Sequence, residues 1–445
     1  MAYRSLLVVL ISIASIAYAE VAPARLEEQA RAYAELGRFN GAVVVARDGK
    51  ALLAKGYGKA NFEWDVPNTP DTKFRLGSIT KQFTGMAILM LEERGKLSVN
   101  EPITKLVPES PEKWKAITIH HLLTHTSGIY NFTALPDYNS KLKREPLTPL
   151  EAMKRVADKD LEFEPGTKHK YSNTGYVVLG LIVERAGGMK YDEFVKKNIF
   201  DPLGMTDTGY DWNRTVIPRR ASGYMDRGTG LVNADFIDMN VPHAAGALYS
   251  TVNDFIKWDA ALRERKLLKP ESYEKYFKPF LNNYAYGWVS EERDGVMTLG
   301  HGGGIDGFST TFVRAPAQSV MVVAFSNVLP NEGGKLAREL LSLALGREAK
   351  LPVKRPRIDL PETALRKYIG EYEVSPTFVL TVTLEDGGLM TQATNQPKLP
   401  VLAESEDVFY PTVVDATIRF EKDASGKITG LVLEQGGRKT PAKRR

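Results

Sequence analysis

The sequence contains no cysteine at any of its 445 positions. This absence excludes disulfide bonds, thiolate metal sites, a cysteine nucleophile and a lipid-modified N-terminal cysteine. An excess of one charge sign is also missing, because the formal net charge is only +5, so no nucleic-acid partner is expected. The basic residues between 438 and 445 are interpreted as a solvated chain end.

Long hydrophobic runs are scarce, and the clearest one opens the chain. Arg4 precedes an apolar stretch from Leu6 to Ala17, and Ala17-Tyr18-Ala19 has the small-x-small pattern of a cleavage site. An apolar core of about a dozen residues is too short to span a bilayer comfortably. We therefore predict a signal peptide over residues 1–19, a periplasmic or secreted mature protein, and no stable membrane insertion. An uncleaved anchor is the alternative.

The pattern of apolar runs over the next 330 or so residues predicts one large domain, with strands at both of its ends and helices between them. The apolar runs predicted as strands are 41–47, 51–55, 309–314 and 319–327. The predicted helices are 27–36, 83–91, 117–123, 176–186 and 251–262. Asp48-Gly49 between two apolar runs is a strong hairpin signal. This order favours an α+β fold in which an antiparallel sheet, built from both ends of the domain, is flanked by helices.

The pattern changes after residue 350. Residues 351–361 hold three prolines and no hydrophobic period, which predicts a linker. Alternation from Phe378 to Leu384, with later apolar runs at 413–420 and 428–434, predicts a small β-barrel or β-sandwich. We therefore expect a main domain over 20–350 and a β domain over 362–445.

Ser78 and Lys81 form the first candidate for chemistry. Three positions apart, they lie about 60° apart on one face of a helix, close enough for their heads to meet. The apolar run 83–91 predicts that this helix is buried, and burial should lower the lysine pKa so that it can take a proton from the serine. The alternative for Ser78 is a simple helix N-cap. Three further Ser-x-x-Lys pairs are interpreted as solvated surface: Ser110/Lys113, Ser140/Lys143 and Ser272/Lys275.

Tyr171 and Asn173 form the second candidate, on a loop that enters the predicted helix 176–186. A phenol beside a lysine ammonium is stabilised as the phenolate and can act as a base. An asparagine offers a donor and an acceptor to a substrate amide or to Lys81. The alternative is a turn tyrosine that packs its ring, with Asn173 as a helix cap.

The third candidate is His301-Gly302-Gly303-Gly304, just before the late hairpin. Consecutive glycines let a backbone approach a ligand and point N–H groups into a site. A glycine-rich turn between strands is the alternative. A similar loop occurs in α/β-hydrolase esterases before a Gly-x-Ser-x-Gly elbow, which this chain lacks.

Metal and cofactor chemistry has little support in the sequence. The six histidines include no His-Glu-x-x-His pair, and no phosphate-binding glycine loop occurs. His120, His121 and His125 are interpreted as structural residues near a helix end. We therefore predict no metal and no cofactor.

The three candidates in this order resemble the penicillin-recognising serine hydrolase family. Within it, the chain is most similar to the branch of class C β-lactamases, D-alanyl-D-alanine carboxypeptidases and related esterases. Three supporting stretches are also similar to that family: 122–128, 201–205 and 245–250. The resemblance covers about residues 25–345 and implies a β-lactamase-like fold with a helical subdomain. The tail from 362 resembles the lipocalin-like barrel of some members.

The resemblance also implies roles for the catalytic candidates. Ser78 is the nucleophile that becomes acylated, and Lys81 keeps it poised and shuttles its proton. Tyr171 is the general base of acylation and then the acid that protonates the leaving group. Asn173 holds the substrate amide and Lys81. The backbone N–H groups of Ser78 and Gly304 form the oxyanion hole.

The third motif departs from the family pattern, with consequences for the substrate. Many members carry Lys-Thr-Gly where this chain has His301-Gly302-Gly303, which the resemblance makes substrate-binding. Histidine is mostly neutral at pH 7, so a substrate carboxylate is less favoured than it would be by lysine. The predicted function is a serine hydrolase acting through an acyl-enzyme on Ser78, with a small-molecule or peptide substrate: a β-lactam, a D-amino-acid peptide or a small ester. The alternative is a non-catalytic binder of cell-wall peptides. The sequence leaves the oligomeric state open.

Overall fold

The computed structural model describes residues 22–445 except 227–229, 395, 397, 412–415 and 436–437. The predicted signal peptide, residues 1–19, lies outside the described residues. None of the helices in the described part of the chain is long and apolar enough to cross a membrane.

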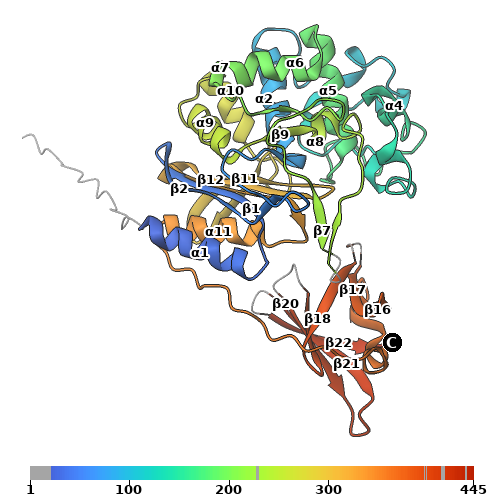
Figure 1. Cartoon of the computed structure of the whole chain (residues 1–445). Helices are drawn as coiled ribbons and strands as arrows, with labels where there is room; N and C mark the ends of the chain where they lie inside the picture. Colours follow the sequence, from blue (N-terminus) through green and yellow to red (C-terminus); the bar gives the residue numbers. More distant parts are fainter. Residues whose placement is uncertain (1–21, 227–229, 395, 397, 412–415, 436–437) are drawn as a thin grey trace, which may run out of the picture.

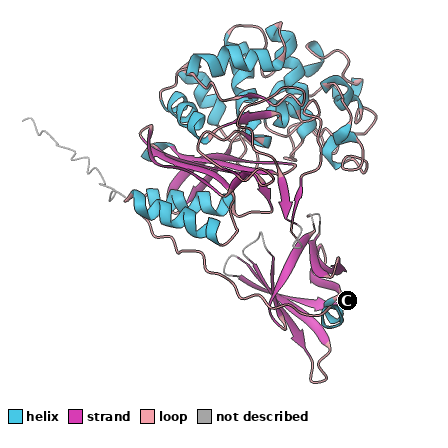
Figure 2. Cartoon of the chain, in the orientation of Figure 1, coloured by secondary structure: helices cyan, strands magenta, loops and turns pink. Residues whose placement is uncertain are grey.

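A six-stranded antiparallel sheet forms the centre of the larger domain (Figure 2). Its strands, in spatial order, are β10 (Val289–Arg293), β11 (Val296–Ile305), β12 (Phe308–Ala315), β13 (Val320–Ser326), β1 (Gly41–Arg47) and β2 (Lys50–Tyr57). β1 pairs with β13 on one side and β2 on the other. The two ends of the domain therefore build one sheet, as predicted.

Both faces of this sheet are covered (Figure 1). Val43 and Val45 belong to a core shared with α1 (Pro23–Glu35) and α11 (Gly333–Ala344). Val44 belongs to the core on the other face, below the remaining helices. Burial on both faces explains why β1 reads as a continuous apolar run and does not alternate.

The helical subdomain implied by the resemblance covers the second face (Figure 1). Its helices are α2 (Thr80–Glu93), α3 (Ile119–Leu123), α4 (Pro149–Lys154), α5 (Asn173–Gly187), α6 (Tyr191–Val195), α7 (Asp201–Leu203), α8 (His243–Gly246), α9 (Val252–Arg263) and α10 (Pro270–Phe277). α2 is buried from Thr80 to Leu91 and packs against α5 and α8. The predicted α+β fold is confirmed.

Short strands form three further small sheets around this core. They are β5–β9–β6 (Phe74–Arg75, Leu248–Ser250, Gly209–Tyr210), β14–β7–β8 (Val328–Leu329, Tyr224–Asp226, Leu231–Asn233) and β3–β4 (Lys59–Asn61, Val66–Pro67). Strand β5 of the first sheet leads toward Ser78, because it ends two residues before Gly77.

The C-terminal strands close into an eight-stranded barrel, which decides between the barrel and the sandwich. The strands are β15 (Gly370–Ser375), β16 (Phe378–Glu385), β17 (Gly388–Ala393), β18 (Leu399–Ser405), β19 (Val408–Pro411), β20 (Ala416–Lys422), β21 (Ile428–Gln435) and β22 (Arg438–Arg444), after a short helix α12 (Glu362–Leu365). The predicted strand 413–420 begins at Ala416 among the described residues. Buried rings of Tyr368, Tyr372, Phe409 and Phe420 pack together in the barrel core.

The segment before the barrel contains no helix or strand from 346 to 361, where all residues are described. Arg38 of the main domain donates a hydrogen bond to the Val353 carbonyl. Arg355 donates to Ala416 O and pairs with Glu404 on the barrel. The segment is therefore tied to both neighbours.

Candidate active site

Ser78 lies in a single 3₁₀ turn, Gly77–Ile79, directly before α2. β5 pairs with β9, and the Leu76 N–H donates to Leu248 O, so the approach to Ser78 is fixed by backbone hydrogen bonds. Gly77 has φ of +53°, and a Cβ there would lie 2.9 Å from the Gly304 nitrogen. Only glycine fits this contact between the nucleophile turn and β11.

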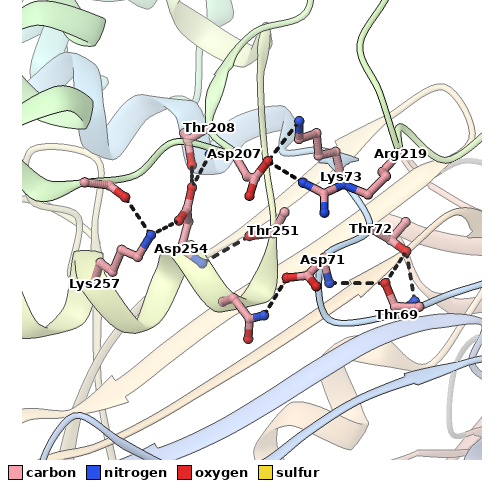
Figure 3. Close-up of polar contacts among 12 residues, drawn as sticks. Thr69, Asp71, Thr72, Lys73, Asp207, Thr208, Arg219, Thr251, Asp254 and Lys257 are labelled. Carbon is pink, nitrogen blue, oxygen red and sulfur yellow. Dashed lines mark hydrogen bonds and ion pairs between the residues drawn. The ribbon is translucent and has the colours of Figure 1, made fainter.

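A polar network holds the strand that precedes Ser78 (Figure 3). Asp207 accepts from Lys73 at 3.0 Å and from Arg219 at 2.9 Å. The Asp207 N–H and the Thr208 hydroxyl both donate to Asp254 Oδ2, at 2.9 and 2.8 Å. These contacts link the residue before β5 to the loop before β6 and to the start of α9. They therefore hold the strand that leads to Ser78.

Lys81 is completely buried, as the sequence predicted, and its Nζ has three oxygen neighbours. Nζ lies 3.0 Å from Ser78 Oγ, 2.9 Å from Asn173 Oδ1 and 2.8 Å from the Ala245 carbonyl oxygen. Among the described residues, none of the hydrogen-bonding partners of Lys81 is a carboxylate. Burial lowers the pKa of Lys81 well below the ordinary lysine value.

Tyr171, two residues before α5, also contacts Ser78. Its hydroxyl donates to Ser78 Oγ at 2.7 Å. Burial raises the pKa of Tyr171, against the effect of the hydrogen bond with Ser78, so the phenol is the resting form. The phenolate that we expected from the neighbouring lysine is therefore not favoured.

Ser78 itself does not cap the helix, since no side-chain cap is present at either the 3₁₀ turn or α2. Its hydroxyl oxygen contacts both the Lys81 amine and the Tyr171 hydroxyl. Asn173, the first residue of α5, completes the group, because its Nδ2 donates to Thr133 Oγ1 at 3.3 Å while Oδ1 faces Lys81. The structure therefore brings all four of these candidates together.

His301 is buried on β11 and held by two neighbours. Its Nδ1 is hydrogen-bonded to the Gly302 carbonyl, so Nδ1 carries the proton and Nε2 accepts from the Tyr284 hydroxyl at 2.9 Å. Burial, with a contribution from the nearby Lys81 charge, lowers the pKa of His301 to about 4. The ring is neutral at pH 7, so it offers no positive charge to a substrate carboxylate.

A cleft of about 250 Å³ opens beside Ser78, and we call it the Ser78 cleft. Its lining residues are Gly77, Ser78, Phe132, Thr133, Tyr138, Asn173, Ile237, Pro242, Ala245, Gly246, Gly304, Ile305 and Asp306. Of the predicted substrate-binding residues, Asn173 and Gly304 are in this lining. His301 and Gly303 are not, and Gly303 packs directly on the Leu76 carbonyl, where a Cβ would come within 1.9 Å.

His125 is the residue whose connection to the site the sequence analysis missed. It accepts from the Lys170 N–H through its carbonyl at 2.9 Å, and from the Ser172 N–H through Nδ1 at 3.2 Å. Its ring lies 4.2 Å from the Tyr171 ring, centroid to centroid. A single buried residue therefore holds both neighbours of Tyr171 and one face of its ring. The sequence signal at this position was the run Thr124-His125-Thr126-Ser127-Gly128, which indicates a turn after a helix but not a contact with Tyr171.

Replacing His125 by leucine should lower kcat by about 10² without a comparable change in KM, because a shift of about 1 Å in the Tyr171 hydroxyl costs that much. His125→Asn should restore much of the loss, since asparagine supplies an acceptor and tolerates the φ of +56° found here. Steady-state kinetics on an ester, with thermal unfolding of each variant, measures both effects. Full activity of His125→Leu would contradict the positioning role.

The Ser140-x-x-Lys143 pair corrects one of our sequence interpretations. Lys143 is not solvated: only 4% of it is exposed, and its Nζ pairs with Asp235 at 3.2 Å and with Asp306. Ser272 is buried as well. Lys143 therefore pairs with Asp306, which lines the Ser78 cleft, but is not itself among the lining residues.

Comparison with known proteins agrees with this geometry. Residues 24–345 match the β-lactamase family, and residues 354–443 match a domain of unknown function, DUF3471. The chain belongs to the β-lactamase family, and it is a β-lactamase-related serine hydrolase that cleaves an amide or ester bond.

Among individual proteins, the chain is 28% identical to penicillin-binding protein 4* of Bacillus subtilis, over 90% of this chain and 94% of that protein. It is 29% identical to the teichoic acid D-alanine hydrolase of Staphylococcus aureus, over 61% of this chain and 70% of the relative. The solved structure of the octameric penicillin-binding protein homologue from Pyrococcus abyssi matches with a TM-score of 0.66 and 27% identity. That match covers 94% of this chain and 99% of the homologue.

Proposed function

We propose that the protein hydrolyses small acyl esters and amides, D-alanyl esters among them, through an acyl-enzyme on Ser78. The observation that carries this proposal is the pair of short contacts at Ser78 Oγ, 3.0 Å from the Lys81 amine and 2.7 Å from the Tyr171 hydroxyl. A serine between a buried amine and a phenol is activated without a carboxylate or a histidine.

Lys81 is the base in the mechanism that we propose. In its neutral form two N–H groups donate to Asn173 Oδ1 and Ala245 O, which leaves the lone pair for the Ser78 hydroxyl proton. Ser78 Oγ attacks the substrate carbonyl carbon while its proton passes to Nζ. The backbone N–H groups of Ser78 and Gly304 donate hydrogen bonds to the carbonyl oxygen as negative charge develops on it.

Tyr171 then acts as the acid. Its phenol gives its proton to the leaving alcohol or amine and regains one from the Lys81 ammonium, so the serine proton ends on the leaving group. Water repeats these transfers in reverse and releases the acid. This assignment moves the base from Tyr171, where the resemblance put it, to Lys81, because burial opposes a phenolate and favours a neutral amine.

The substrate class follows from charge. The neutral His301 and the carboxylate of Asp306 in the lining disfavour substrates with a carboxylate next to the scissile bond, such as penicillins. Neutral or amine-bearing acyl groups are favoured. The name of the staphylococcal relative, a teichoic acid D-alanine hydrolase, adds support for D-alanyl esters.

A fluorophosphonate probe tests the acyl-enzyme directly. We expect one covalent adduct on the wild-type protein, mapped to Ser78 by peptide mass spectrometry, and none on Ser78→Ala. Ser172→Ala is the matched control and should still be labelled, because the buried Ser172 hydroxyl has no hydrogen-bond partner among the described residues. A wild-type protein that reacts with neither this probe nor a fluorescent penicillin would favour the non-catalytic binding protein.

We also propose that the mature protein works outside the cytoplasm. The support is the signal-like pattern of residues 1–19 and its small-x-small end at Ala19. N-terminal sequencing of exported protein should begin at Glu20, and a cytoplasmic protein that still begins at Met1 would refute this.

A further inference from the structure

Among the described residues that line the Ser78 cleft, Asp306 is the one with an acidic side chain. It follows the last residue of β11, two positions beyond Gly304, whose N–H is our second oxyanion donor. Its side chain is 18% exposed. Ser78, Gly304 and Asp306 therefore line the same cleft.

Buried Lys143 fixes Asp306 from behind. The Lys143 Nζ donates to Asp306 Oδ1 and to Asp235 Oδ2, and the lysine side chain is only 5% exposed. No described residue donates a hydrogen bond to the second oxygen, Asp306 Oδ2. One oxygen is therefore used to hold the carboxylate in place, and the other remains available to a ligand.

The formal charges of Lys143, Arg144, Asp235 and Asp306 sum to zero, but among the described residues Asp306 is the member of this cluster that lines the cleft. Lys143 is shared by two carboxylates, and Arg144 compensates Asp235 from the more exposed side, at 3.2 Å. The part of the lining that the structure describes contains no lysine, arginine or histidine. Burial, with a smaller contribution from the charge of Asp306, raises the pKa of Tyr138, which lines the same cleft and stays neutral.

We propose that Asp306 Oδ2 binds the ammonium group of an aminoacyl substrate while its ester or amide carbonyl lies at Ser78. The proposal rests on the proposed function and deepens it, because it names a free primary amine as the feature that the site selects. A hydrogen bond between charged groups in a partly desolvated cleft gives a preference of about 10- to 100-fold for the amine.

Three p-nitrophenyl or thioester substrates of matched size test this on the wild-type enzyme: D-alanyl, N-acetyl-D-alanyl and D-lactyl. The lactyl compound replaces the amine by a hydroxyl of similar size. We expect kcat/KM to be about 10- to 100-fold higher for the D-alanyl substrate than for either analogue. Equal values for the three would overturn the ammonium site while leaving the hydrolase intact, whereas no Ser78-dependent turnover of any of them would overturn the proposed function.

Two isosteric variants locate the preference. Asp306→Asn should reduce the ratio of kcat/KM between the D-alanyl and D-lactyl substrates to within about threefold, since it removes the charge and retains an oxygen for Lys143. Asp235→Asn removes the other carboxylate from the same lysine, outside the cleft lining, and should keep the preference. Fluorophosphonate labelling of Ser78 verifies that each variant has a formed active site. Retention of the preference by Asp306→Asn, or its equal loss in both variants, would overturn the proposal.

Discussion

Replacing Tyr171 by phenylalanine should lower kcat for an ester or amide by about 10²–10⁴ at neutral pH. The substitution removes the hydroxyl that donates to Ser78 at 2.7 Å and leaves the ring that packs on His125. The leaving group then lacks its acid, while the fold retains the same ring contacts. Pre-steady-state and steady-state kinetics on an ester substrate measure the loss.

Tyr176→Phe is the matched control for this prediction. The Tyr176 hydroxyl is also buried, but it donates to the Leu123 carbonyl and does not touch Ser78. Its removal should cost about 1 kcal/mol of stability and leave kcat within a few-fold. Equal losses of kcat in the two variants, or a Tyr171→Phe enzyme with more than a third of the wild-type kcat, would contradict the acid role.

Replacing Lys81 by methionine should abolish turnover and raise the stability of the fold. The lysine is buried without a carboxylate among its hydrogen-bonding partners, so its charged form is disfavoured in the folded state. Methionine has a similar length and no charge. We expect kcat to fall by about 10²–10⁴ or more while the free energy of unfolding increases.

The stability difference between Lys81→Met and the wild type should depend on pH, and the lowered pKa of Lys81 determines the direction. Because the folded pKa of Lys81 is lowered, the unfolded chain binds more protons than the folded one between that pKa and about 10.4. The contribution of Lys81 to the free energy of unfolding therefore rises with pH over this range. The destabilisation caused by burying Lys81 is largest below its folded pKa. The advantage of Lys81→Met over wild type in urea unfolding should be greater at pH 6 than at pH 9.

Lys143→Met is the control with the opposite sign. This lysine is nearly as buried, but it sits between two carboxylates, so its removal should destabilise the protein by about 3–5 kcal/mol. If Lys81→Met were as destabilising as Lys143→Met, the description of Lys81 as an uncompensated buried amine would be wrong.

The order of strands and helices followed from the sequence where hydrophobic periods and turn signals were strong. The hairpin at Asp48-Gly49 and the buried run after Lys81 are examples. The β10–β11 hairpin was missed, although Asp294-Gly295 has the same positive φ angles. β10 is an edge strand whose last three residues are exposed and charged, so it lacks the apolar alternation that marks a strand.

The candidate site was predictable from the sequence where it depends on side chains of a particular type, and less so where it depends on backbone position. Ser78, Lys81, Tyr171 and Asn173 were identified from residue type, spacing and order. The Ala245 carbonyl that binds Lys81 has no sequence signature, because every residue has a carbonyl. Lys143 was misjudged because most of its neighbours in sequence are polar, whereas the two carboxylates that pair with it lie 92 and 163 positions away.

The position of β1 between β2 and β13 also determines when the protein can complete its fold. Gly41 pairs with Ser326, about 285 residues later, and at a synthesis rate of roughly 5–20 residues per second that partner arrives about 15–60 s after β1. Until then β1 has an unpaired apolar edge that other chains could bind. β11, which supplies the Gly304 N–H, is also made late. The nascent chain therefore carries Ser78, Lys81 and Tyr171 long before β11 can place Gly304 against Gly77.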